Sequence, residues 1–191
     1  MEQFSQIKDL MPDVLLHCKE CPDTIALHSL SHASAEFLRS SGAWCSLFYG
    51  DLVKDSPVVP LKDFPNALLN EVVLIKLNGF LASKGLVSAL SDGVLYLDDP
   101  YIPDRDVIDG LVCSCSLVPD PHAAYIPPRV VREFSSAFIY LALSDILLMP
   151  NVPYSNPQLG AYFAQKYEKE LIIAKARLSQ NRTGVNRGFA G

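Results

Sequence analysis

The stretch EVVLIKLNGFL, residues 71–81, decides how the middle of this chain folds. Its first seven residues are rich in β-branched and aliphatic side chains, a composition typical of a strand. They lead into Asn78-Gly79, the dipeptide that best adopts the positive φ angles of a two-residue hairpin turn. Two further apolar residues follow the turn. We therefore predict an antiparallel β-hairpin here.

Two more strands are predicted on the C-terminal side of this hairpin. Residues 94–97 follow an Asp-Gly pair. Residues 111–118 follow a glycine, and side chains of different polarity alternate along them. Residues 51–66 contain three prolines and are predicted to be a loop or an edge strand. Together, residues 72–118 predict a small antiparallel β subdomain.

A helix is predicted before this subdomain, from Asp23 to near Gly42. Pro22-Asp23-Thr24 is a typical helix start, with Asp23 as the expected N-cap. Residues 1–21 are interpreted as an irregular arm. Apolar residues recur at helical spacing at Leu27, Leu30, Ala33, Phe37 and Leu38.

Two further helices are predicted after residues 119–128, a connector that holds four prolines. The first ends before Pro150, and the second starts with Asn156 as N-cap and Pro157 at its first position. Residues 157–180 would form a helix about 36 Å long at 1.5 Å per residue. The preceding helix has its apolar stripe at Val131, Phe134, Phe138, Leu141, Ala142 and Ile146.

The fold predicted from these elements is mainly α with a β insertion. Its core would be a bundle of the three main helices, the last of them long. The predicted parts are an N-terminal arm and first helix (1–44), an inserted β-rich subdomain (45–126), the second and third helices (127–180) and an extended C-terminal tail (181–191).

Composition favours a protein that buries surface against neighbours, because 49% of its residues are hydrophobic and only 19% are charged. Residues 1–126 carry 17 acids against 8 bases, whereas residues 127–191 carry 4 acids against 8 bases. An acidic body repels nucleic acid, and the basic part lacks a Lys/Arg cluster that would grip phosphates. Sequence-specific DNA binding is therefore not expected.

Cysteine usage predicts a reducing cytoplasm. The five cysteines are an odd number, and the first residues lack the basic and apolar regions of a secretory signal. The longest apolar stretch, residues 134–148, contains three serines and an aspartate. It is too short to span a bilayer and is interpreted as a buried helix.

One group of residues suggests a zinc site, namely His17, Cys18, Cys21, His28 and His32. Cys18 and Cys21 have metal-ligand spacing, and His28 and His32 are one helical turn apart. However, only six residues separate Cys21 from His28, far fewer than the roughly 12 to 15 of a zinc finger. We favour packing and surface roles, and we assign no catalytic, cofactor-binding or metal-binding residue. Cys18 beside His17 is also the one local candidate for a thiol nucleophile, but sequence neighbours on an extended arm point apart.

Three other groups have simpler structural interpretations. Cys113 and Cys115 share one face of a predicted strand and are interpreted as small apolar fillers rather than a disulfide. The aromatic residues of the last two helices are interpreted as core or subunit-interface residues. A solvated loop is favoured over a divalent cation site for the acidic cluster at Asp98, Asp99, Asp104, Asp106 and Asp109.

Three stretches, in their order and spacing, resemble one protein family. They are PDVLLH with CPD (residues 12–17 and 21–23), AEFLRSSGAW (residues 35–44), and MPNVPYSNP (residues 149–157). They are similar to the head-to-tail adaptor, or connector, proteins of tailed bacteriophages, particularly of the short-tailed type.

This resemblance implies a structural subunit and not an enzyme. Such subunits form a ring, commonly of about twelve copies, that joins the portal to the tail nozzle or tail tube and continues the DNA channel. The expected place is the head-tail junction of the virion, after synthesis in the bacterial host cytoplasm, with no cofactor and no membrane. The C-terminal tail reaches the portal in relatives. The candidate portal contacts are Arg177, Arg182, Val185, Asn186, Arg187 and Phe189.

Two alternatives stay open. The chain could be a tail-completion protein that binds below an adaptor. It could also be a small cytoplasmic metal-binding or thiol-dependent enzyme that uses the cluster from His17 to His32.

Overall fold

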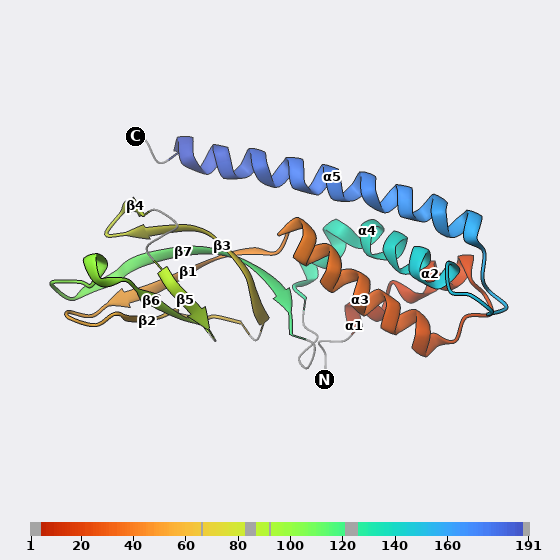
Figure 1. Ribbon diagram of the computed structural model, residues 1–191, viewed down its shortest axis with the longest axis horizontal. Coiled ribbons are helices and arrows are strands. Elements are labelled where there is room, and N and C mark those ends of the chain that lie inside the picture. The colour runs from red at the N-terminus through yellow and green to blue at the C-terminus, as the bar shows by residue number, and fades with distance from the viewer. Residues whose placement is uncertain (1–4, 66, 83–86, 92, 121–125, 189–191) are drawn as a thin grey trace. The chain divides into compact units, whose positions relative to one another are not determined.

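The computed structural model describes residues 5–65, 67–82, 87–91, 93–120 and 126–188. The chain forms two compact units, which we call unit 1 (Met1–Ala43 and Ala124–Gly191) and unit 2 (Trp44–Ala123). Unit 1 is built from helices and unit 2 from antiparallel strands (Figure 1). Helices account for 47% of the chain and strands for 27%, so the protein mixes α and β structure rather than being mainly α.

Unit 1 contains two short and three long helices. The long helix α4 packs against both of the other long helices, α3 and α5. The three long helices agree in position with those predicted from the apolar spacing. The bounds are α1 Ser5–Lys8, α2 Met11–His17, α3 Asp23–Ser41, α4 Pro128–Leu147 and α5 Pro157–Gly188.

The end of α3 is confirmed, but its predicted cap is wrong. Gly42 follows the helix with φ 66°, a left-handed conformation, and donates its N–H to the carbonyl of Leu38 at 2.9 Å. At the other end the N-cap is Pro22, and no side chain caps the helix. Asp23 is instead the first helical residue, where its negative charge complements the helix dipole.

The N-terminal arm predicted for residues 1–21 is wrong over most of its length, because α1 and α2 occupy it. Pro12 lies in the first turn of α2, where proline disrupts no helical hydrogen bond. Val14 is fully buried. The arm therefore contributes to the core of unit 1 and packs against α3 and α4.

Helix α5 starts as predicted and ends later than predicted. The Oδ1 atom of Asn156 accepts a hydrogen bond from the N–H of Leu159 at 3.1 Å, which confirms this N-cap. The helix continues to Gly188, so residues 181–188 are helical and do not form the extended tail that was predicted. Extending an existing helix by one turn costs less free energy than starting a new helix. A helix end that contains glycine can therefore still be helical. Residues 189–191 lie outside the described part of the chain.

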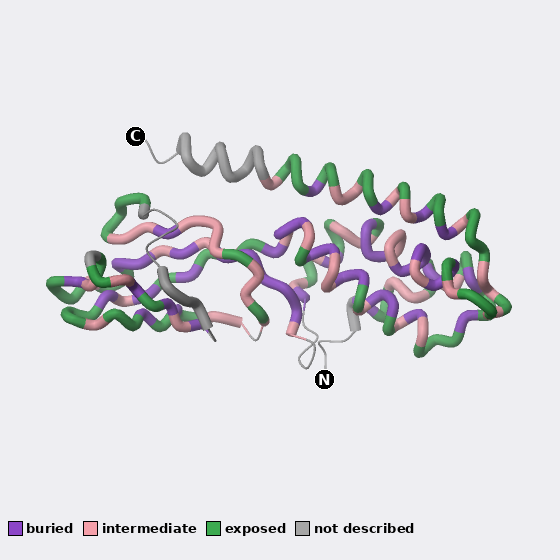
Figure 2. Tube along the Cα trace, in the orientation of Figure 1, coloured by how far each residue is buried: buried purple, intermediate pink, exposed green. Residues whose placement is uncertain are grey.

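Buried residues recur along α3 and α4 (Figure 2), and aromatic residues are among them. Phe37 of α3 is fully buried, and its ring centroid lies 5.6 Å from that of Phe138 and 5.1 Å from that of Phe134, both on α4. Tyr167 of α5 completes the group, with its ring centroid 6.3 Å from that of Phe37. One aromatic cluster therefore joins all three long helices.

The described strands of unit 2 form a four-stranded sheet in the order β1-β7-β3-β4 and a three-stranded sheet in the order β2-β6-β5, and neighbouring strands in both sheets are antiparallel. A short 3₁₀ helix, η2 (Asp99–Tyr101), precedes β7. The strand bounds are β1 Cys45–Leu52, β2 Val58–Pro60, β3 Ala67–Leu77, β4 Phe80–Ala82, β5 Val87–Ser91, β6 Val94–Leu97 and β7 Val107–Pro119.

The predicted hairpin is confirmed. Leu77 at the end of β3 pairs with Phe80 at the start of β4. Asn78 and Gly79 between them have φ angles of 52° and 82°, as a two-residue turn of this kind requires. The strands predicted at residues 94–97 and 111–118 also form, as β6 and β7.

Strand β1 was not predicted. It covers residues 45–52 and pairs with β7 along almost its whole length. The predicted insertion boundaries, 45–126, and the bounds of unit 2, residues 44–123, differ by one residue at the start and three at the end.

The two sheets approach each other closely at Gly50. A Cβ atom at this position would lie 2.5 Å from Cγ1 of Val59 and 3.1 Å from the carbonyl oxygen of Pro60, both in β2. The rings of Phe48 and Phe64 lie nearby, with centroids 4.7 Å apart. Glycine therefore allows a contact between the sheets that a side chain would block.

Within the part of the chain that is described, none of the helices combines the length and the apolar character needed to cross a membrane.

Candidate functional site

The two cysteines of the proposed zinc cluster lie where α2 gives way to α3. Both thiols are buried, and the Sγ atom of Cys18 lies 3.0 Å from the carbonyl oxygen of Val14, to which it donates. Burial and the neighbouring Cys21 raise the pKa of Cys18 to about 11. A thiol with this pKa is protonated at neutral pH, so Cys18 has the character of a core side chain rather than a nucleophile.

The three histidines of the same cluster are directed to different neighbours. The ring of His17 lies edge-on to Phe163, with centroids 5.1 Å apart. The Nδ1 atom of His32 lies 3.5 Å from Oδ2 of Asp145, whose pKa is raised by burial and lowered in part by this histidine. His28 is exposed. Among the described residues, no three His, Cys, Asp or Glu side chains come together as metal ligands, and the five residues considered for a zinc site do not form one group.

Cys113 and Cys115 lie side by side on the same face of β7, as predicted. Both are fully buried, and their Sγ atoms are 3.2 Å apart without a disulfide bond. The hydrogen bond to Cys113, together with burial, raises the pKa of Cys115. The pair fills part of the interior of unit 2 on the buried face of β7.

The acidic residues near β7 make contacts of their own. The Nζ atom of Lys62 lies 2.8 Å from Oδ1 of Asp51 and 2.8 Å from Oδ1 of Asp109. Its hydrogen bond lowers the pKa of Asp51. Oδ1 of Asp106 accepts a hydrogen bond from the backbone N–H of Lys54 at 2.7 Å. Asp109 therefore connects β7 to the turn that holds Lys62, and Asp106 connects two loops.

The candidate portal contacts lie at the C-terminal end of α5. Arg177 is exposed on the helix. Arg182, Val185, Asn186 and Arg187 belong to its last turns, where the backbone is described, and Phe189 lies outside the described residues. These residues are thus close in sequence and, except for Phe189, share one helix.

The four-stranded sheet has one buried face. Phe48 of β1, Cys113 of β7 and Ile75 of β3 lie opposite one another across three strands, and all three are buried. Because side chains alternate along a strand, the residues between them must occupy the other face.

That other face is what we call the open sheet face. It includes Leu47, Tyr49, Leu74, Lys76, Leu81, Val112 and Ser114.

The open sheet face is mostly apolar, with Ser114 and Lys76 between its apolar residues, and it reaches the surface. Leu47 is 59% exposed, Tyr49 44% and Leu81 64%, while Leu74 and Val112 are half-buried. A solvated face of an antiparallel sheet normally carries polar residues, and contiguous exposed apolar residues mark interaction sites. This face therefore has the character of a binding surface.

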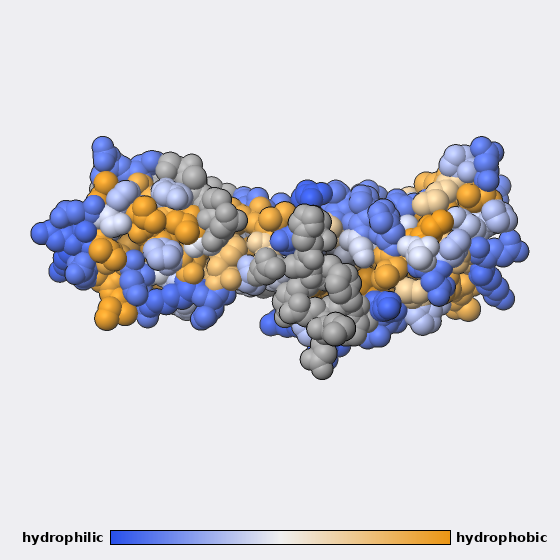
Figure 3. All heavy atoms as spheres, turned by 90° about the horizontal axis from the view of Figure 1, so that it is seen from below, coloured by the Kyte–Doolittle hydropathy of each residue, from blue (hydrophilic) through white to orange (hydrophobic). Residues whose placement is uncertain are grey.

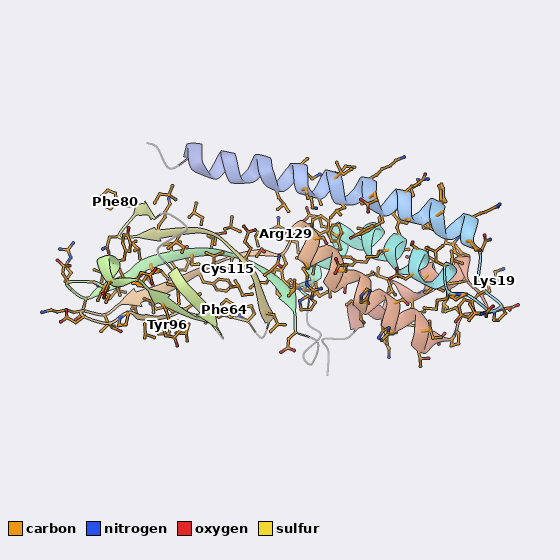
Figure 4. All side chains as sticks on the ribbon, viewed as in Figure 1. Lys19, Phe64, Phe80, Tyr96, Cys115 and Arg129 are labelled. Atoms are coloured by element: carbon orange, nitrogen blue, oxygen red, sulfur yellow. The ribbon has the colours of Figure 1, made fainter. Side chains whose placement is uncertain are left out.

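Apolar residues are exposed at other points of unit 2 as well. Phe80, at the hairpin beside this face, is 79% exposed (Figure 4). Tyr96, which pairs with Val58 in the other sheet, is 40% exposed. The view from below also shows hydrophobic residues at the surface of this unit (Figure 3).

The two units differ in charge. Residues 44–123 hold eleven acidic and five basic residues, so unit 2 is acidic. The part of α5 after Glu170 contains Lys175, Arg177, Arg182 and Arg187 and no acidic residue. The chain thus contains an acidic unit and a helix end that is rich in basic residues.

Sequence reasoning missed the open sheet face because it missed β1. Leu47, Phe48 and Tyr49 are three consecutive apolar residues, so the strand shows no alternation between polar and apolar positions. A short uninterrupted apolar run is the signal that could have indicated a strand here. No protein-family model matches this chain, and no curated protein sequence matches it.

Proposed function

We propose that this protein is a structural assembly subunit, a head-to-tail adaptor whose ring joins a phage portal to the tail. The observation that carries the proposal is the open sheet face, because Leu47, Tyr49 and Leu81 expose apolar surface on the solvent side of an antiparallel sheet. Such a face supports a role in which binding other proteins is the function. We infer the particular assembly, the junction of portal and tail, from the resemblance of the three stretches described above.

In this proposal the two units serve different partners. Helices α3, α4 and α5 form a helical bundle core that docks on the portal, and unit 2 faces the tail nozzle or tail tube. Helix α5 supports this division, because its 32 residues would span about 48 Å, whereas the 20 residues of α4 would span about 30 Å. A helix that is longer than the helix it packs against can contact another protein through its end.

The acidic character of unit 2 has a use in a DNA channel. If its carboxylates face the lumen, passing DNA is repelled rather than gripped, since Lys/Arg contacts to phosphate would slow ejection. Asp99 and Asp104 are exposed and suitable for neutralisation to asparagine. We expect slower DNA ejection from particles that carry both changes, and an unchanged ejection rate would contradict this channel role.

The proposal is tested by binding to portal rings of the same phage. We expect the full chain to co-sediment with portal rings, and a chain ending at residue 180 to bind much more weakly. The shortened chain should keep its helical circular dichroism, because Ala174 is the last residue of α5 described as buried. Leu16→Ser, a change at a 68% exposed position of α2, is the matched control and should bind like the unaltered chain.

Absence of co-sedimentation by the full, folded chain would overturn the proposed function. Equal binding by the full and shortened chains would leave an adaptor role but remove the C-terminal end of α5 from the portal contact.

A further inference from the structure

Among the asparagines of this chain, Asn78 is the one that glycine follows. It lies at the exposed tip of the β3–β4 hairpin, where its backbone N–H donates to the carbonyl of Gly110 at 2.7 Å. No hydrogen bond joins its side chain to any other residue that the structure describes. The side-chain amide of Asn78 is therefore exposed to water and free to rotate.

Gly79 leaves the backbone nitrogen beside this amide unhindered. Apart from its chain neighbours, no described residue would have an atom within 4 Å of a Cβ atom placed there. Two other asparagines lack this combination. Asn156 caps α5 through its Oδ1 atom and precedes Pro157, whose nitrogen carries no hydrogen. Asn70 donates a hydrogen bond from its Nδ2 atom to the hydroxyl of Ser116 at 3.1 Å.

An exposed asparagine followed by an unhindered backbone nitrogen can lose its amide without an enzyme, which makes asparagine a thermolabile residue. The deprotonated nitrogen of Gly79 attacks the Cγ atom of Asn78, the side-chain nitrogen leaves as ammonia, and a five-membered succinimide ring forms. Water then opens the ring at either carbonyl and leaves aspartate or isoaspartate at position 78. The sum converts an amide and water to a carboxylate and ammonium, so water is the only co-reactant.

The hairpin must open locally for this reaction. Ring closure needs the Gly79 nitrogen to rotate towards the Asn78 side chain, and this rotation displaces β4. Strand β4 contains three residues, Phe80–Ala82, and lies at the edge of the four-stranded sheet, so its release breaks few contacts. The N–H bond from Asn78 to Gly110 precedes the rotating bond and can persist.

We propose that Asn78 is a site of spontaneous deamidation, which proceeds through local opening of β4. Isoaspartate adds one atom to the main chain, so the product no longer matches a two-residue turn with Leu77 opposite Phe80. Because this hairpin carries Leu81, the modification also alters one edge of the open sheet face. The inference does not depend on the proposed function.

The test incubates the folded full chain at mildly alkaline pH and digests samples with trypsin. Cleavage after Lys76 and Lys84 releases residues 77–84, in which mass spectrometry detects conversion of the amide to the acid. A synthetic peptide of the same residues gives the rate without the fold. We expect the folded chain to react at most about a hundredfold more slowly than the peptide, which corresponds to about 2.8 kcal/mol for the opening.

Two variants serve as controls. Asn78→Ser removes the amide at an exposed position, so residues 77–84 should keep their mass. Gly50→Ala strains the contact between the two sheets but lies away from the hairpin turn in sequence. It should leave the rate at Asn78 unchanged, because opening of β4 alone does not require the rest of unit 2 to unfold.

Three results would overturn the inference. The first is a folded chain in which residues 77–84 stay unmodified for more than about a hundred times the half-life of the peptide. The second is faster deamidation at another asparagine of the folded chain than at Asn78. The third is a rate at Asn78 that increases in Gly50→Ala in proportion to its loss of stability, because the reaction would then require unfolding of the whole unit.

Discussion

The Sγ atoms of Cys113 and Cys115 lie 3.2 Å apart in the interior of unit 2, two residues apart on β7. Both side chains are fully buried, and burial contributes to the raised pKa of Cys115. Close thiols of this kind can suggest redox chemistry. Their inaccessibility instead indicates that they fill the space beneath the central strand.

Thiol accessibility gives the first prediction. Cys45 is exposed, whereas Cys18, Cys21, Cys113 and Cys115 are buried. A thiol reagent added to the native chain should therefore modify Cys45 rapidly and the other four only as the chain unfolds. Mass spectrometry after labelling with and without urea measures this difference. Rapid native labelling at Cys113 or Cys115 would show that the interior of unit 2 is open.

The second prediction concerns the aromatic cluster of unit 1. Phe37→Ala removes a fully buried ring that contacts Phe134, Phe138 and Tyr167. We expect a loss of about 3–5 kcal/mol in the free energy of unfolding. Urea unfolding followed by helical circular dichroism reports mainly on unit 1. Leu16→Ala, at an exposed position, should stay within about 0.5 kcal/mol of the unaltered chain.

A third prediction follows from the contact between the sheets. Gly50→Ala would place a Cβ atom 2.5 Å from Cγ1 of Val59, and the resulting strain should cost about 1–3 kcal/mol. Val59→Ala removes the clashing methyl groups. In a double-mutant cycle the combined variant should therefore lose less stability than the sum of the two single changes. Strict additivity would contradict the close approach of β1 and β2.

The fourth prediction is a pH dependence from the contacts of Lys62. Its hydrogen bond lowers the pKa of Asp51, so the stabilisation is present above the ordinary aspartate value of about 3.9 and is lost as pH falls through the lowered pKa. Hydrogen bonds to Asp109 and Asp51 raise the pKa of Lys62. At basic pH the same stabilisation is therefore lost as the pH rises through the raised pKa of Lys62.

Lys62→Met should therefore lower the urea midpoint of unit 2 at neutral pH, and it should lower it by less at an acidic pH near or below the lowered pKa of Asp51. Lys54→Met is the matched control. The Nζ atom of Lys54 is 4.0 Å from Oδ2 of Asp55, farther than Lys62 is from its partners, and both side chains are exposed. Equal destabilisation by Lys62→Met at both pH values would contradict an electrostatic role.

Local signals in the sequence predicted much of this fold. Asn78-Gly79 specified its hairpin because few dipeptides tolerate two positive φ angles. Asn156-Pro157 specified the start of α5, and Gly42 the end of α3. In each case the backbone conformation depends on the residue at that place, so one chain suffices to predict it.

Features that depend on distant partners were missed. The segment of α2 is only seven residues long, and its packing against α3 and α4, with Val14 fully buried, supports its helical form. β1 is apolar on both faces, and its identity as a strand comes from pairing with β7, more than fifty residues later. The open sheet face could not be predicted for the same reason, because it is created by the register of four strands.

The adaptor role is tested by native mass spectrometry of the chain mixed with portal rings of the same phage. We expect one discrete complex in which a portal ring carries a full ring of this chain, about twelve copies. A spectrum that contains only free portal rings and free chain, with the chain folded, would contradict it.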